Sequence, residues 1–150
     1  MLNYFNATLV HRYMKKIAYM YHQMGGLVVA GTDTPAGIFT FPGLALHREL
    51  MLFVESGFTE IEAIRAATIN AAKALEHEDL GCIQEQAIAD MVILNANPLI
   101  NIENTTNIHL VVKSGAPLEK QAIFEHIPSL QQQERFINEL ITNFKAHQLL

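Results

Sequence analysis

The sequence predicts an α/β fold, and three observations support that prediction. The first is a run of four apolar residues, Leu27 to Ala30, between Gly25-Gly26 and Gly31. An unbroken apolar run between glycines is typical of a short strand buried on both faces. The second is that apolar residues at helical spacing precede and follow this run. The third is that the helical spacing of apolar residues ends after Glu76 and two further strand patterns follow. Helix, buried strand and helix in this order form a unit of α/β architecture.

Composition narrows the function classes. The chain has 150 residues, 50% of them hydrophobic, which suits one ordinary domain with a proper core. Its apolar stretches are too short to span a membrane, and we find no signal-peptide pattern, so we expect a cytoplasmic location and no membrane partner. The net charge of -5, without a clustered basic face, argues against nucleic acid as a partner. Cys82 is the only cysteine, which excludes an internal disulfide and fits a reducing compartment.

The first half of the chain reads as helices around the apolar run. An amphipathic helix is expected from about residue 8 to residue 24, where Gly25-Gly26 ends it. Prolines and glycines in residues 34–43 predict a loop. A second helix is expected from Leu44 to Ser56, and Gly57 stops it. The helical stripe of the first segment consists of Val10, Tyr13, Met14, Ile17, Tyr21 and Met24.

Later elements are indicated by caps and turn residues. Thr59 followed by Glu62 is a capping box that begins a third helix, and Asn70 is expected to cap a short helical turn. Strands are expected at Met91 to Leu94 and Ile108 to Lys113. A last helix is expected to begin at Ser129 with Gln132 as its capping partner, and its apolar stripe is Phe136, Ile137, Leu140, Ile141 and Phe144. One parallel-type strand cannot make a sheet, so we expect the chain to be the end of a larger fold.

Three stretches carry a family resemblance. They are "VVAGTDTPAG", "LHRELMLFVESGFTEIEAIRAATINAAKAL" and "ADMVILNANPLINIENTTNIHLVVKSG". Together they resemble the C-terminal part of metal-dependent amidohydrolases, and most closely the branch that contains imidazolonepropionases and Xaa-Pro dipeptidases (prolidases). The resemblance covers about residues 8 to 116 and keeps the order and spacing of the motifs.

The resemblance implies a C-terminal fragment of a (β/α)8 TIM barrel with part of a small β-sandwich and a terminal helix. Residues 27–33 would be the last barrel strand. Residues 1–76 would be the last β/α portion of the barrel, and residues 77–118 would be the C-terminal share of a sandwich built from both chain ends. Residues 119–150 would be a helical extension.

The resemblance also implies a function for Asp33. In the family, the matching aspartate at the strand tip ligates a divalent metal, usually zinc, and carries the proton of the attacking water. The implied reaction is hydrolysis of C–N bonds in small cyclic amides or Xaa-Pro-type dipeptides. From the residues alone, an Asx-turn or helix cap explains Asp33 equally well, so both readings stay open at this point.

Two further positions are candidates for substrate binding. His47 lies on the helix after the proposed site loop and either reaches a substrate or pairs within the fold. Thr34, like Thr32, flanks Asp33, and its hydroxyl either orients the carboxylate or satisfies turn backbone. Both positions are kept as candidates. Cys82 and Asp90 are interpreted as structural residues.

The chain also departs from the family pattern. The family's His-x-His, its lysine or glutamate and its two later histidines have no counterpart here, and the seven histidines include no pair at chelating spacing. Glu85-Gln86-Ala87 stands where the family has a Pro-Gly-Lys turn. A catalytic zinc takes about three protein ligands, so we expect no metal in this chain alone and no activity alone. We expect a homo-oligomer or association with a complementing N-terminal portion. The alternative is a non-catalytic remnant or interaction domain that oligomerises.

Overall fold

The structure is a computed structural model of the chain. It describes residues 2–34, 41–119, 129, 131, 132, 134–136, 138, 139 and 142. The chain divides into two compact units, Met1–Ala116 and Pro117–Leu150, which are treated separately below. No helix among the described residues is both long and apolar enough to span a bilayer.

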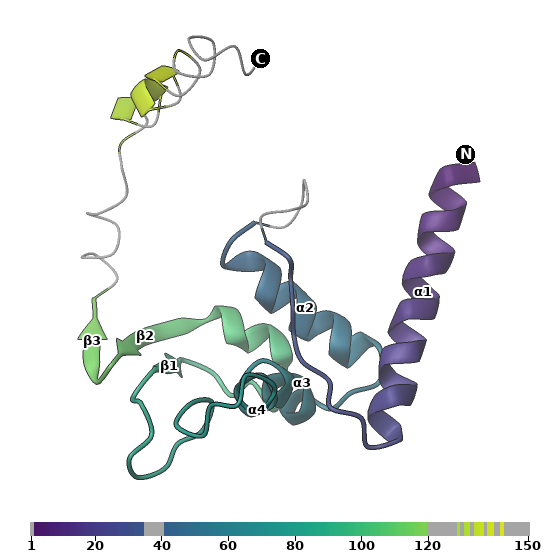
Figure 1. The fold of residues 1–150 in the computed structure, drawn as a ribbon, viewed down its shortest axis with the longest axis horizontal. Coiled ribbons are helices and arrows are strands. Elements are labelled where there is room, and N and C mark those ends of the chain that lie inside the picture. Colours follow the sequence, from purple (N-terminus) through teal and green to yellow (C-terminus); the bar gives the residue numbers. More distant parts are fainter. Residues whose placement is uncertain are drawn as a thin grey trace. The chain divides into compact units, whose positions relative to one another are not determined.

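The first unit contains helices followed by a small sheet (Figure 1). The elements are α1 (Leu2–Gln23), α2 (Leu44–Glu55), α3 (Glu60–Ala66), α4 (Ile69–Ala74), β1 (Met91–Leu94), the 3-10 helix η1 (Ile102–Thr106) and β2 (Ile108–Lys113). A third strand, β3 (Ala116–Leu118), begins at the last residue of this unit. The four α-helices and the first two strands of the sheet were predicted from the sequence and are confirmed, whereas η1 was not predicted. The first helix begins earlier than its apolar stripe predicted.

Phe58 is the centre of the contact between α1 and the helices that follow it. Its side chain is 3% exposed. The rings of His22, Tyr19 and Phe53 lie 4.5, 5.6 and 5.0 Å from its ring centroid. Gly57 has φ 111°, and a Cβ there would lie 3.0 Å from the Tyr19 ring. The tight turn after α2 therefore brings the Phe58 ring against α1.

Charged groups fix α1 at two further points. Lys15 Nζ lies 2.6 Å from Glu55 Oε2, and His22 Nε2 lies 3.0 Å from Glu62 Oε1. Glu62 is also the third helical residue of the Thr59 capping box, which is present in full as predicted. The Thr59 backbone N–H, together with the His22 contact, lowers the pKa of Glu62 from its ordinary 4.5 to about 2. One carboxylate thus caps α3 and holds α1.

A compact apolar core lies between the helices and η1. Leu50 of α2, Ala63 of α3 and Ile102 of η1 are buried together, with exposed fractions of at most 5%. Helical spacing places Leu50 on the inner face of α2, and the small Ala63 lets α3 approach closely. The core therefore connects the helices to the segment that leads into the sheet.

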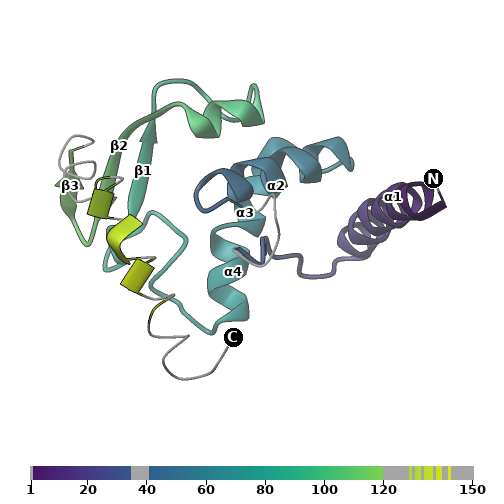
Figure 2. The same ribbon diagram turned by 90° about the horizontal axis from the view of Figure 1, so that it is seen from above.

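The sheet has the strand order β1-β2-β3 (Figure 2). β1 and β2 are antiparallel, with Met91 opposite Val112, and the register shifts between Ile93 and Leu94. Ser114 and Gly115 form the turn to β3, with φ values of 51° and 81°. Two positive φ values in a two-residue loop are typical of a type I′ hairpin.

Asp90 supports this hairpin from the start of β1. It accepts a hydrogen bond from the Ser114 N–H at 2.7 Å and pairs with Lys113. The Lys113 ammonium group is the main reason why the pKa of Asp90 is lowered. Its interpretation as a structural residue agrees with these contacts.

Gln86 occupies a backbone conformation that favours glycine. The Ala87 N–H donates to the Gln84 carbonyl, which closes a four-residue turn, and Gln86 has φ 69° in its third position. A positive φ at this position characterises type II turns. Gln86 therefore has a positive φ at the position where the sequence resemblance expected the glycine of a turn.

Of the last helix, the structure describes only part. Its predicted start is confirmed, because Ser129 and Gln132 exchange hydrogen bonds as a capping box does. Phe136 of the predicted stripe is 61% exposed. The other stripe residues, Ile137, Leu140, Ile141 and Phe144, lie outside the described residues.

The first prediction concerns acid stability. The folded pKa of Glu62 is depressed, so its contribution is fully present above pH 4.5 and is lost as the pH falls toward 2. Glu55 and Asp90 have pKa values lowered in the same direction. Urea unfolding between pH 2 and 6 should therefore give a shallower pH dependence for Glu62→Gln than for the native chain. Glu60→Gln is the control and should keep the native slope. An unchanged slope in Glu62→Gln would contradict the assignment.

The second prediction concerns the strained turn. Gln86→Gly should raise the free energy of unfolding, because glycine adopts this φ without a Cβ clash. Glycine also loses more conformational entropy on folding, which reduces the expected net gain to about 0.5–1 kcal/mol. Thermal melts would measure the change. Gln84→Gly in the same turn is the matched control and should destabilise. A loss of stability in Gln86→Gly would show that the side chain stabilises the turn.

Candidate functional site

The candidate site lies on the segment of residues 27–33, between α1 and α2. The structure assigns this segment neither helix nor strand. Its exposure alternates along the chain as in an extended strand: Val28, Ala30 and Thr32 are half-buried, whereas Leu27, Val29, Gly31 and Asp33 are exposed. The expectation of a strand buried on both faces is therefore wrong. Within residues 2–34 and 41–119 no other strand pairs with it, so only its helix-facing side is covered.

Helices provide the backbone partners of this segment. The Ala30 N–H donates to the Ala66 carbonyl at the end of α3, at 3.0 Å. The Gly31 N–H donates to Glu49 Oε1 of α2, at 2.9 Å. Asn70 Nδ2 of α4 donates to the Val28 carbonyl, at 3.0 Å. These three bonds hold the extended segment against the helices.

Asn70 does not cap α4 as predicted. The N-cap of α4 is Thr68, and its side chain makes no capping bond. Asn70 lies within the helix instead, and its amide group reaches the Val28 carbonyl. A side chain that binds a distant backbone group is not visible in a local sequence pattern, which is why the prediction failed.

Asp33 lies on the open side of the segment. Asp33 is exposed, as are Gly31 and Val29 before it, and its φ is 50°. A Cβ built on Gly31 would meet no atom within 4 Å. Thr32 Oγ1 accepts the Thr34 N–H at 3.3 Å, so this hydroxyl serves the turn backbone. The carboxylate therefore lies on a side that the described helices leave open.

His47 makes its hydrogen bond elsewhere. Its Nδ1 lies 3.0 Å from Thr105 Oγ1 of η1. The Thr105 hydroxyl donates its own proton to the Ile102 carbonyl at 2.8 Å, so the His47 Nδ1 is the donor in this pair. His47 thus joins α2 to η1.

The described residues do not fit a metal ion by themselves. They contain no group of three or more His, Cys, Asp or Glu side chains that could hold one. A catalytic zinc takes about three protein ligands, and Asp33 alone supplies one. Glu49, whose Oε1 accepts the Gly31 N–H, has a second oxygen, Oε2, that is buried and has no hydrogen-bond partner among the described residues.

Glu49 was not identified as a site residue from the sequence. A signal was present, because Ala45 and Phe53 lie four residues before and after it. On a helix these positions share one side, so the acid lies within an apolar surface. A charge in such a place needs a partner.

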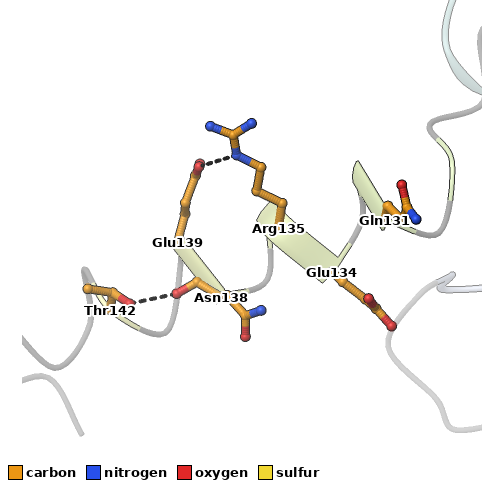
Figure 3. A pocket seen from close by; sticks show the side chains of 6 residues that line it. All are labelled: Gln131, Glu134, Arg135, Asn138, Glu139 and Thr142. Atoms are coloured by element: carbon orange, nitrogen blue, oxygen red, sulfur yellow. Dashed lines mark hydrogen bonds and ion pairs between the residues drawn. The ribbon is translucent and has the colours of Figure 1, made fainter.

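Two hollows elsewhere among the described residues offer no comparable arrangement. One lies along the last helix (Figure 3), where Arg135 and Glu139 form an exposed ion pair at 3.3 Å. Exposed pairs at this spacing contribute little. Its lining consists of Gln131, Glu134, Arg135, Asn138, Glu139 and Thr142. A second hollow, of about 480 Å³, is lined by Ile69, Lys73, Glu76, His77, Glu78, Cys82 and Gln84, and mixes both charge signs.

The chain is similar in sequence and in fold to known hydrolases. The model of the amidohydrolase family matches residues 5–118. Ochratoxinase of Aspergillus niger is 37% identical over 81 residues, which are 52% of this chain and 17% of that protein. A candidate prolidase from Bifidobacterium longum has a similar fold, with a TM-score of 0.62 and 30% identity over 81% of this chain and 29% of that chain. Phenylurea hydrolase B is similar over 53% of this chain and 18% of that chain, with a TM-score of 0.51 and 33% identity. The chain spans less than a third of each of these relatives.

Proposed function

Because this chain belongs to the amidohydrolase family, we propose that it carries part of the active site of a hydrolase that cleaves carbon–nitrogen bonds in small amides or dipeptides. The observation that carries the proposal is the place of Asp33, at the end of an extended segment and on the side that no described helix covers. Barrel enzymes have their catalytic groups at the carboxyl ends of strands. An acid at such an end is well placed to act on a substrate.

Asp33 would carry a proton in this reaction. Its carboxylate takes the proton of the attacking water and returns it to the leaving nitrogen, as general acid–base catalysis of C–N cleavage requires. We propose that the complete site is metal-dependent, with zinc as the expected ion, and that its other ligands come from residues outside this chain. One carboxylate is too few for the ion.

The substrate class is the finer part of the proposal. Similarity to the candidate prolidase supports Xaa-Pro-type dipeptides, and cyclic amides are the other class that the family resemblance suggests. Thr34 and His47 stay proposed substrate contacts. The hydrogen bond between His47 and Thr105 favours a structural role for His47. A cytoplasmic location is proposed from the composition and from the single Cys82.

A second candidate function is an interaction domain that oligomerises, and α1 favours it. Five large apolar residues recur along one side of α1 and are between 53% and 64% exposed: Tyr13, Met14, Ile17, Met20 and Tyr21. Met24, directly after the helix, is 84% exposed. Lys15, Tyr19 and His22 make the contacts with the other helices from the opposite side. A continuous apolar face of this kind marks an association surface. A complementing N-terminal portion and a second copy are the two proposed partners.

The third prediction tests the hydrolase. The 150-residue chain alone should hydrolyse Xaa-Pro dipeptides and N-acyl amino acids no faster than background, with or without added zinc or manganese, because it offers one ligand. A fusion protein in which a complementing N-terminal portion precedes this chain should hydrolyse these substrates. Asp33→Asn should then lower turnover by about a hundred- to ten-thousand-fold, the range for a placed proton carrier.

Asp90→Asn is the control for a carboxylate outside the site and should keep the activity. Turnover by the isolated chain that disappears in Asp33→Asn would contradict the view that the site is incomplete. An assembled protein that keeps its full activity after the Asp33→Asn substitution would contradict the role of the carboxylate.

The fourth prediction concerns association. The isolated chain should form dimers or larger oligomers at micromolar concentration, because the apolar face of α1 and the open side of the extended segment 27–33 gain by leaving water. Light scattering would measure the mass. Ile17→Glu should shift the population toward monomer, whereas Lys16→Glu, beside it but off the apolar face, should not. A compact native monomer across the micromolar range would refute the association surface.

A further inference from the structure

Glu49 connects the second helix to the segment that bears Asp33. The residue is half-buried on α2 and its Oε1 accepts the Gly31 N–H at 2.9 Å. In a sheet this N–H would go to a neighbouring strand. Here a carboxylate from a helix receives it, two residues before Asp33. The contact therefore fixes the backbone immediately ahead of the candidate catalytic group.

The same side chain carries a cost. Its second oxygen, Oε2, is shielded from solvent and has no hydrogen-bond partner among the residues that the structure describes. A buried polar atom without a partner destabilises a fold, and an apolar residue of similar size is often neutral or stabilising in its place. The surroundings suit such a residue, because Ala45 and Phe53 flank Glu49 on α2. Glu49 is thus a poor choice for stability alone.

We propose that Glu49 is a positioning residue for Asp33. Its Oε1 holds the Gly31 N–H, and this bond keeps residues 31–33 in one backbone conformation, with Asp33 at a positive φ on the open side. Reactive groups need such restraint, because a misplacement of about 1 Å can cost on the order of a hundredfold in rate. Strain and unsatisfied groups are concentrated at functional sites for this reason. The inference rests on the proposed role of Asp33.

The fifth prediction separates positioning from ordinary stabilisation. Glu49→Met removes both oxygens at similar volume, so its Tm should equal or exceed that of the native chain. Its Gly31 amide should exchange with solvent at least about tenfold faster, because local opening no longer breaks a hydrogen bond. The three-bond couplings that report χ1 of Asp33 should change from one rotamer to an average. NMR hydrogen exchange and couplings on the 150-residue chain would measure both.

Two further variants serve as controls. Glu49→Gln keeps an acceptor for Gly31, so its exchange and the Asp33 couplings should stay within about threefold of native, given the modest strength of one hydrogen bond. Glu55→Met makes the same substitution on the same helix, away from residues 27–33, and should leave the Gly31 amide unchanged.

Three results would overturn the inference. They are a Gly31 amide that already exchanges freely in the native chain, equal loss of protection in Glu49→Gln and Glu49→Met, or a fall in Tm of Glu49→Met without a change at Asp33. If Glu49→Met does not fold, Glu49→Gln still decides, because it must keep the Gly31 bond. Since these measurements read geometry and not hydrolysis, failure of Glu49 as a positioning residue is distinguishable from failure of Asp33 as a catalytic one.

Discussion

An extended backbone needs hydrogen-bond partners along its edges, and in this chain the partners of residues 28–31 come from helices. Ala66, Glu49 and Asn70 lie in three separate helices, and each contributes one bond. The consequence is an alternation in which one side of the segment is covered and the other is open. The position of Asp33, the free space beside Gly31 and the cost at Glu49 all follow from that arrangement. A parallel strand is normally covered on both faces and paired on both edges. The extended segment of residues 27–33 is covered on one side only.

Much of the local structure was predictable because its causes are local. The capping box at Thr59, the strand bounds at Met91–Leu94 and the ends of α2 depend on neighbours within a few residues. The surroundings of residues 27–33 depend on contacts between residues 18 to 42 positions apart. The apolar run predicted a strand buried on both faces, but the structure buries only one side of it. Burial on the second face requires strands that the described residues do not contain. Asn70 was misread because its amide donates to the Val28 carbonyl, 42 residues away, which a local pattern does not show.

At the candidate site the sequence identified candidate residues, but not their geometry. Asp33 was identified from its place after a buried run and from a family resemblance, which the family match over residues 5–118 confirms at the level of the family. Its φ of 50° and its exposure, which it shares with Gly31, could be read only from the structure. His47 was left open between two roles, and its bond to Thr105 is a contact 58 residues away. Glu49 gave a readable signal, an acid on an apolar helix side, which is more informative than a histidine of intermediate polarity.

The sheet has a property that matters for the chain on its own. β1 is the outer strand of the order β1-β2-β3, and its sequence, Met-Val-Ile-Leu, contains no charge. Asp90, directly before the strand, forms an ion pair with Lys113 and accepts a hydrogen bond from the Ser114 N–H. An uncharged outer strand without a repelling neighbour is a template on which further strands grow, chain upon chain. The same four residues that complete the sheet therefore leave an edge at which a strand of another chain can pair.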